Sequence, residues 1–145
     1  MPLAYFDSSA FVKLLVEEPG TALAVALWDG CDAALSSRLA YPEVRAALAA
    51  AHRNRDLDAN GLVQAEENWD LFWRATRPVE LTAAIALHAG ELAKTHSLRG
   101  ADAAHLASAL AISDRSLIVV AWDRRLHAGA LAADLGVAPM TLDPA

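Results

Sequence analysis

The sequence contains one cysteine, no long apolar run and no excess of basic residues, and each of these absences excludes a class of protein. Because Cys31 stands alone, no disulfide can form within the chain, which is typical of proteins from a reducing compartment. No uninterrupted apolar stretch is long enough to span a bilayer, and the N-terminal residues lack the basic segment of a signal peptide. We therefore expect a cytoplasmic protein with no membrane partner.

Internal repeats, low-complexity segments and inter-domain linkers are also absent from the 145 residues. Aromatic residues make up only 6% of the chain, whereas hydrophobic residues, many of them alanine, make up 55%. A composition of this kind favours helices that pack closely around one core. We therefore expect residues 1–145 to form a single domain.

The net charge of −6 excludes the basic surface that is typical of general nucleic-acid-binding proteins. It does not exclude an enzyme that acts on RNA or DNA, because two bound divalent cations would bring the net charge to −2. The acidic balance also leaves room for a basic protein partner.

Short apolar runs alternate along the chain with longer segments of helical periodicity. This alternation predicts an α/β fold, in which a short, mostly parallel sheet lies between two layers of helices and a helical hairpin is inserted. The expected helices cover residues 8–16, 21–28, 43–54, 62–73, 82–96, 101–112 and 124–135, and residues 56–61 form the turn of the hairpin. The expected strands are Leu3–Phe6, Ala33–Leu35, Val79–Leu81, Leu117–Trp122 and Val137–Leu142.

Four acidic residues lie within apolar sequence, where carboxylates are rare unless they are paired or bind a metal: Asp7, Glu43, Asp102 and Asp123. Asp7 and Asp123 directly follow expected strands, and Glu43 lies in the helix that is entered from the second strand. The carboxyl ends of parallel strands meet at one edge of a sheet, so these three are expected to converge there. Asp102 reaches the same edge if its helix begins there.

Each acid taken singly has an ordinary structural interpretation. Asp7 can cap the following helix, Glu43 and Asp102 can complement a helix dipole, and Asp123 can pair with a neighbouring arginine. Their joint placement favours a functional site instead.

A cluster of carboxylates requires compensating protons, arginines or cations. Two carboxylates about 4 Å apart repel by roughly 4 kcal/mol at an effective dielectric constant near 20. Oxygen donors alone favour Mg²⁺ or Mn²⁺ over zinc, and such ions activate water for phosphodiester hydrolysis. The four acids therefore predict a metal-dependent nuclease.

Four segments resemble motifs of the PIN-domain ribonucleases, and specifically of the VapC-type toxins of bacterial toxin–antitoxin pairs: Phe6–Ala10, Pro42–Leu48, Leu98–Ala107 and Ala121–Leu126. The resemblance covers essentially the whole chain and implies a PIN-like α/β/α domain. It also implies that the acids of these segments form a catalytic quartet that holds Mg²⁺ or Mn²⁺: Asp7, Glu43, Asp102 and Asp123.

One position departs from the family pattern. Many PIN domains carry Ser or Thr where this chain has Ala121, two residues before the last acid. The supporting hydrogen bond of that hydroxyl is then missing, so we expect Ser8 or Ser9 to support the metal-binding carboxylates instead.

The same resemblance implies a function and partners. VapC-type toxins cleave structured RNA, typically tRNA or ribosomal RNA, and so arrest translation. They usually form homodimers and are inactivated by a VapB-type antitoxin whose tail covers the active site. An arginine in such a tail would suit an acidic cleft, because guanidinium and carboxylate groups pair in forked geometry.

Basic residues next to the four acids are candidates for contacts with RNA phosphates: Lys13, Arg99, Arg124 and Arg125. Neutralisation of the acidic cluster is an equally good interpretation of them.

Two histidines and one aromatic face have weaker functional interpretations. His105 and His127 stand at helical spacing from Asp102 and Asp123 and can reach a metal, although packing is the commoner role of a helical histidine. The aromatic face of residues 69, 72 and 73 fits core packing or an interface better than base stacking.

Two other functions are alternatives to the nuclease. A phospho-acceptor receiver domain shares the layered fold but requires paired acids after the first strand, an Asp after the third and a Lys after the last. This chain has Asp7-Ser8, Leu81-Thr82 and no lysine beyond Lys94, which rejects that function. A catalytically silent PIN-like scaffold that binds RNA or protein is the alternative, and metal-dependent RNA cleavage distinguishes the two.

Overall fold

Five short strands form one sheet in which every neighbouring pair is parallel. The computed structural model describes residues 2–143. The strand order is β3-β2-β1-β4-β5, so β1 lies at the centre of the sheet. The strands are β1 (Leu3–Phe6), β2 (Ala33–Ser37), β3 (Thr76–Val79), β4 (Ile118–Val120) and β5 (Gly136–Ala138).

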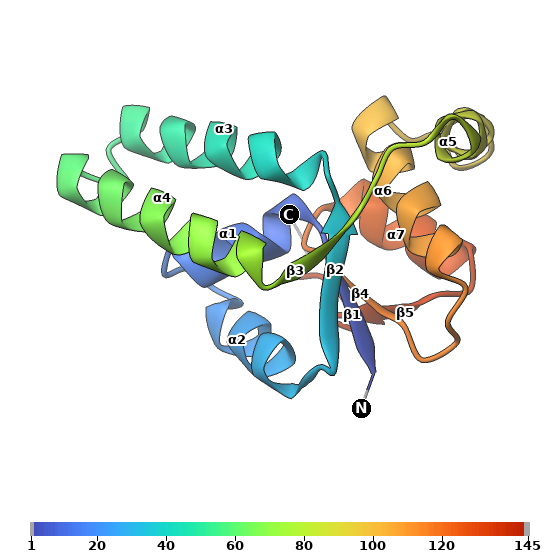
Figure 1. Ribbon diagram of the computed structural model, residues 1–145, viewed down its shortest axis with the longest axis horizontal. Helices are drawn as coiled ribbons and strands as arrows, with labels where there is room; N and C mark the ends of the chain where they lie inside the picture. Colours follow the sequence, from blue (N-terminus) through green and yellow to red (C-terminus); the bar gives the residue numbers. More distant parts are fainter. Residues whose placement is uncertain (1, 144–145) are drawn as a thin grey trace.

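Helices cover both faces of this sheet. Figure 1 shows α1 to α4 on one side, in blue to green, and α5 to α7 on the other, in yellow to orange. The hairpin of α3 and α4 extends away from the sheet on the first side, as the sequence predicted. The helices are α1 (Ser8–Leu15), α2 (Thr21–Gly30), α3 (Ala40–Arg53), α4 (Ala59–Arg74), α5 (Ala83–His96), α6 (Gly100–Ile112) and α7 (Arg124–Ala132).

The three-layer α/β/α architecture is thus confirmed, and it has two hydrophobic cores. Successive residues of a strand point to opposite faces of the sheet. Tyr5 and Val119 accordingly pack with α5, α6 and α7, whereas Phe6 and Val120 pack with α1, α3 and α4. Burial on both faces explains why the central strands are continuously apolar in sequence.

The aromatic face of α4 belongs to the second core. Trp69 is fully buried, its ring centroid lies 4.7 Å from that of Phe11, and its indole N–H donates to the carbonyl oxygen of Tyr41. Phe72 and Trp73 pack against the same cluster. Of the two interpretations that the sequence favoured for this face, core packing or an interface, the structure shows core packing for Trp69.

Several predicted boundaries were wrong because pairing with a neighbouring strand decides where a strand ends. β2 continues to Ser37, and β3 spans Thr76–Val79, whereas Val79–Leu81 was expected. Pro78 lies inside β3, which the sheet tolerates because β3 is an edge strand. β5 ends at Ala138, since Pro139 has no N–H with which to extend the ladder.

The start of α3 also differs from the prediction. The helix begins at Ala40, so Pro42 is its third residue and not near the first position. The position is tolerated because the first N–H groups of a helix have no partner within the helix. Within residues 2–143, no helix combines the length and apolar character that crossing a bilayer requires.

Candidate active site

Two of the four acids are held by the loops that follow adjacent strands. Asp7 follows β1 and caps α1, because its Oδ1 accepts the N–H of Ala10 at 2.9 Å. Asp123 follows β4 and caps α7 in the same way, with Oδ1 accepting the N–H of Leu126 at 3.0 Å. The capping role and a functional role are therefore compatible, since each cap uses Oδ1 and leaves Oδ2 outside the cap; Oδ2 of Asp123 instead accepts from Arg99.

The other two acids lie in the first turns of helices. Glu43 lies in the first turn of α3 and Asp102 in the first turn of α6. The structure brings all four together around one cavity of ≈ 290 Å³. The cavity is lined by Asp7, Ser8, Ser9, Glu43, Arg99, Ala101, Asp102, His105 and Asp123.

Asp7 is the most deeply buried of the four acids, and its pKa is perturbed. Its exposed fraction is 3%, and burial raises the pKa of its carboxyl group from 3.8 to about 6. His105 and the hydrogen bonds from Ser9 and Ala10 act in the opposite direction, while the charge of Asp123 adds to the increase. A buried carboxylate with this perturbation, next to other acids, is typical of a functional site.

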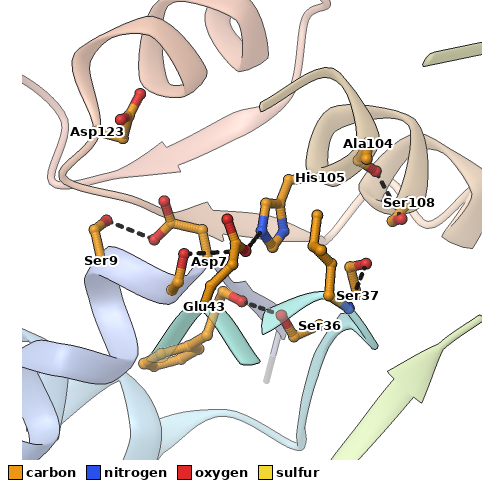
Figure 2. Close-up of polar contacts among 12 residues, drawn as sticks. Asp7, Ser9, Ser36, Ser37, Glu43, Ala104, His105, Ser108 and Asp123 are labelled. Atoms are coloured by element: carbon orange, nitrogen blue, oxygen red, sulfur yellow. Dashed lines mark hydrogen bonds and ion pairs between the residues drawn. The ribbon is translucent and has the colours of Figure 1, made fainter. Parts of the chain in front are cut away.

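Some oxygens of these carboxylates accept hydrogen bonds from the protein, and others do not. Oδ1 of Asp7 accepts the Ser9 hydroxyl at 2.6 Å in addition to the Ala10 N–H. Oε1 of Glu43 lies 2.6 Å from Nε2 of His105 and accepts the Ser8 hydroxyl at 3.3 Å (Figure 2). Among residues 2–143, no side chain or backbone group bonds Asp7 Oδ2, Glu43 Oε2 or Asp102 Oδ1. No buried side-chain oxygen in that range lacks a partner, so these three oxygens face solvent in the cavity.

Arg99 is the basic residue that lines this cavity. Its Nε donates to Asp102 Oδ2 at 3.1 Å and its guanidinium NH₂ to Asp123 Oδ2 at 3.3 Å. These contacts, first of all the hydrogen bond to Asp102, raise the pKa of Arg99. The side chain is nevertheless 63% exposed, so the bridge is a solvated one that an incoming group can displace.

The remaining predicted phosphate contacts lie elsewhere. Lys13 pairs with Glu18 at 3.0 Å and lies over the ring of Trp122, and Arg124 donates to the carbonyl oxygen of Asp143. Both line a separate cavity of ≈ 360 Å³. Arg125 is exposed in the first turn of α7 and lines neither cavity.

The Ser9 hydroxyl links the segments that follow β1 and β4 by hydrogen bonds. It donates to Asp7 and accepts the backbone N–H of Trp122 at 2.9 Å. It therefore ties the end of β1 to the segment around Ala121, where the family pattern usually has a hydroxyl. Ser8 contacts Glu43 instead, so each of the two serines supports a different carboxylate.

The two histidines have different surroundings. His105 is buried, with Nδ1 2.7 Å from the Tyr5 hydroxyl and Nε2 against Glu43. Burial acts to lower the pKa of His105, but the hydrogen bond and charge of Glu43, with Asp7 and Asp102, outweigh it and raise the pKa. His127 is bonded to the carbonyl oxygen of Pro139 and does not line the acidic cavity.

Tyr5 is the residue of this site that sequence reasoning missed. It lies inside an apolar strand, where a tyrosine ordinarily serves packing, and no spacing relates it to His105, which is 100 residues away. No sequence signal could have found it.

The donor set fits a hard divalent cation, since four carboxylates around one cavity supply only oxygen ligands. Among residues 2–143, no three Asp, Glu, His or Cys side chains stand close enough together to hold an ion in this arrangement. Arg99 bridges Asp102 and Asp123 here, and His105 holds Glu43. A metal would therefore compete with Arg99 for Asp102 Oδ2 and Asp123 Oδ2, whereas the bond from His105 to Glu43 Oε1 leaves Oε2 available.

Comparison with known proteins agrees with this geometry. The family model described as PIN domain matches residues 4–133. The chain belongs to the PIN-domain family. Over 144 residues, this PIN-domain chain is 69% identical to the protein named ribonuclease VapC49 of Mycobacterium tuberculosis strain H37Rv, covering 99% of this chain and 100% of the relative. The predicted resemblance to PIN-domain proteins of the VapC type is therefore confirmed.

Solved PIN-domain structures share the fold at low sequence identity. Mycobacterium tuberculosis VapC20, described as a sarcin–ricin loop cleaving toxin, superimposes with a TM-score of 0.66 at 19% identity, covering 86% of this chain and 93% of its own. VapBC2 of Rickettsia felis, bound to a DNA fragment from its promoter, gives a TM-score of 0.65 at 12% identity, covering 93% and 96%. The α/β/α fold of the PIN domain is thereby confirmed.

Proposed function

We propose that this PIN-domain protein is a Mg²⁺- or Mn²⁺-dependent endoribonuclease toxin that hydrolyses phosphodiester bonds in structured RNA, tRNA or ribosomal RNA, and so arrests translation. One observation carries the proposal. Asp7, Glu43 and Asp102 line a common cavity, and each presents to it one oxygen that no group within residues 2–143 bonds. Asp123 would supply the fourth carboxylate oxygen when the Arg99 guanidinium moves away from its Oδ2. The ribonuclease name of the 69% identical relative supports the same reaction class.

The four carboxylates would hold the metal, which when bound supplies an activated water and a positive charge for the phosphate oxygens. The capping bonds of Asp7 and Asp123 fix these side chains to the backbone, so they hold their oxygens in place without rearrangement. Ser8 and Ser9 orient Glu43 and Asp7.

Arg99 is the best-placed contact for an RNA phosphate. A guanidinium that now pairs with two carboxylates at the rim can turn to a phosphate when a metal neutralises them. Lys13, Arg124 and Arg125 lie outside the acidic cavity and would contact phosphates further along the RNA.

The proposed partners are a VapB-type antitoxin and a second copy of the chain in a homodimer, in the cytoplasm. The toxin–antitoxin complexes among the structural neighbours support the antitoxin. The site supports it as well, because Arg99 demonstrates that a guanidinium fits two of these carboxylates at once, as an arginine of an antitoxin tail would.

The test is cleavage of total cellular RNA by the purified protein, with Mg²⁺ or Mn²⁺ and with chelator, followed by sequencing of the new 5′ ends. We expect discrete metal-dependent products from one RNA species, and none from Asp7→Asn. Asp114→Asn is the matched control, because Asp114 is a partly exposed acid that does not line the acidic cavity. Cleavage that survives the chelator or Asp7→Asn would overturn the mechanism, and RNA binding without cleavage would indicate the silent scaffold instead.

A further inference from the structure

A chain of hydrogen bonds runs from the hydrophobic core into the acidic cavity. The Tyr5 hydroxyl lies 2.7 Å from His105 Nδ1, and His105 Nε2 lies 2.6 Å from Glu43 Oε1. Tyr5 is 0% exposed and His105 2% exposed. Burying two polar rings in an alanine-rich core costs free energy unless every polar atom is bonded. The network is therefore a specific feature of the fold.

The direction of the first hydrogen bond follows from the groups around Tyr5. The backbone N–H of Ser37 donates to the Tyr5 oxygen at 3.0 Å, and an N–H can only donate. The nearby hydroxyls of Ser36 and Ser108 donate to the carbonyl oxygens of Phe6 and Ala104, at 2.6 and 2.7 Å (Figure 2). The proton of Tyr5 is thus free to bond His105 Nδ1. A tyrosine hydroxyl ordinarily ionises only at about pH 10, so Tyr5 retains this proton at neutral pH.

A neutral imidazole that accepts a hydrogen bond at Nδ1 carries its own proton at Nε2. Nε2–H then donates to Glu43 Oε1, which the Ser8 hydroxyl also bonds. With both donors on Oε1, the second oxygen, Oε2, faces the cavity. A nitrogen that carries a proton has no lone pair for a metal, so this tautomer also excludes His105 as a ligand.

We propose that Tyr5 fixes the tautomer of His105 and that His105 thereby orients Glu43, so that Oε2 faces the metal position. Tyr5 and His105 are positioning residues for the reaction proposed above, on which this inference rests. Partners of this kind, one hydrogen bond removed from a metal, typically change metal affinity by about 10- to 100-fold when they are lost.

The tautomer can be measured without metal or RNA. Long-range ¹H–¹⁵N spectra of the metal-free protein, taken above the titration range of His105, are expected to show the Nε2–H form for His105. In Tyr5→Phe the Nδ1–H form should become populated, whereas the exposed His88 should be unchanged. An Nδ1–H form in the wild-type protein, or an unchanged His105 spectrum in a folded Tyr5→Phe, would overturn the assignment.

The orienting role is tested by Mn²⁺ titration of three variants. His105→Leu should weaken Mn²⁺ binding by about 10- to 100-fold, and His105→Gln, which keeps an N–H donor, should recover most of it. His127→Leu is the matched control, because it removes another buried histidine, one that bonds a carbonyl oxygen away from the cavity. It should lower stability and leave Mn²⁺ affinity unchanged.

The outcomes separate this inference from the proposed function. Equal Mn²⁺ affinity in His105→Leu and the wild-type protein would refute the orienting role even if RNA is cleaved. Loss of Mn²⁺ affinity in His105→Leu would support it even if the wild-type protein cleaves no RNA.

Discussion

Replacing Asp7 with Asn is expected to make the metal-free protein more stable while it abolishes cleavage. Burial raises the pKa of Asp7 from 3.8 to about 6, so the folded state holds this proton more tightly than the unfolded state. Ionisation of Asp7 therefore opposes folding. Stability decreases as the pH rises from 3.8 through 6, and the full cost is present above pH 6.

The magnitude follows from that difference. One pKa unit corresponds to about 1.4 kcal/mol, so ionised Asp7 costs the folded state about 3 kcal/mol at pH 7.5. Asn carries no charge, and its Oδ1 can accept the same bonds from Ala10 and Ser9. We expect Asp7→Asn to raise the free energy of unfolding by roughly 1–3 kcal/mol at pH 7.5, and by much less at pH 4.5, where wild-type Asp7 is protonated.

The assay is urea unfolding with chelator at both pH values. Asp114→Asn is the control of opposite sign, because hydrogen bonds from Ser116 lower the pKa of Asp114, and it should not gain stability at pH 7.5. Saturating Mg²⁺ should stabilise the wild-type protein and not Asp7→Asn. The reasoning fails if Asp7→Asn is no more stable than wild type at pH 7.5, or if its gain is the same at pH 4.5.

Four further substitutions test separate features of the structure. Arg99→Gln should tighten Mn²⁺ binding roughly two- to fivefold in calorimetry, because an exposed competing bridge is lost, and should slow RNA cleavage; weaker Mn²⁺ binding would contradict this. Ser9→Ala should cost about 1–3 kcal/mol in urea unfolding, because the Trp122 N–H loses its acceptor; an unchanged midpoint would contradict this. Gly20→Ala should lower stability by roughly 1–3 kcal/mol, since φ is +100° and the new Cβ would lie 2.9 Å from the Trp122 ring. Gly90→Ala, in the middle of α5 with open space around it, should instead gain about 0.5–1 kcal/mol.

The sequence by itself determined the layer architecture and the acidic site. Strands that alternate with helices form a parallel sheet, and the carboxyl ends of such strands share one edge, so Asp7 and Asp123 had to lie near each other. Glu43 follows the same rule because it lies in the helix entered from β2, and Asp102 reaches that edge because α6 begins there. These inferences hold because they depend on local pattern and on rules common to all sheets of this type.

Strand boundaries were decided by the tertiary structure. β3 contains Pro78 and begins at Thr76 because Ser36 and its neighbours in β2 offer a pairing edge there. Local propensity disfavours a strand through proline, and only its place at the edge of the sheet reverses that preference.

The chemistry within the site was likewise decided only in three dimensions. Arg99 bridges Asp102 and Asp123 although 24 residues separate it from the second acid, and His105 joins Tyr5 to Glu43 across separations of 100 and 62 residues. No sequence spacing encodes such contacts, because they depend on how α3 and α6 pack against the sheet. The sequence determined which carboxylates meet, and the packing decided which oxygen each presents to the cavity.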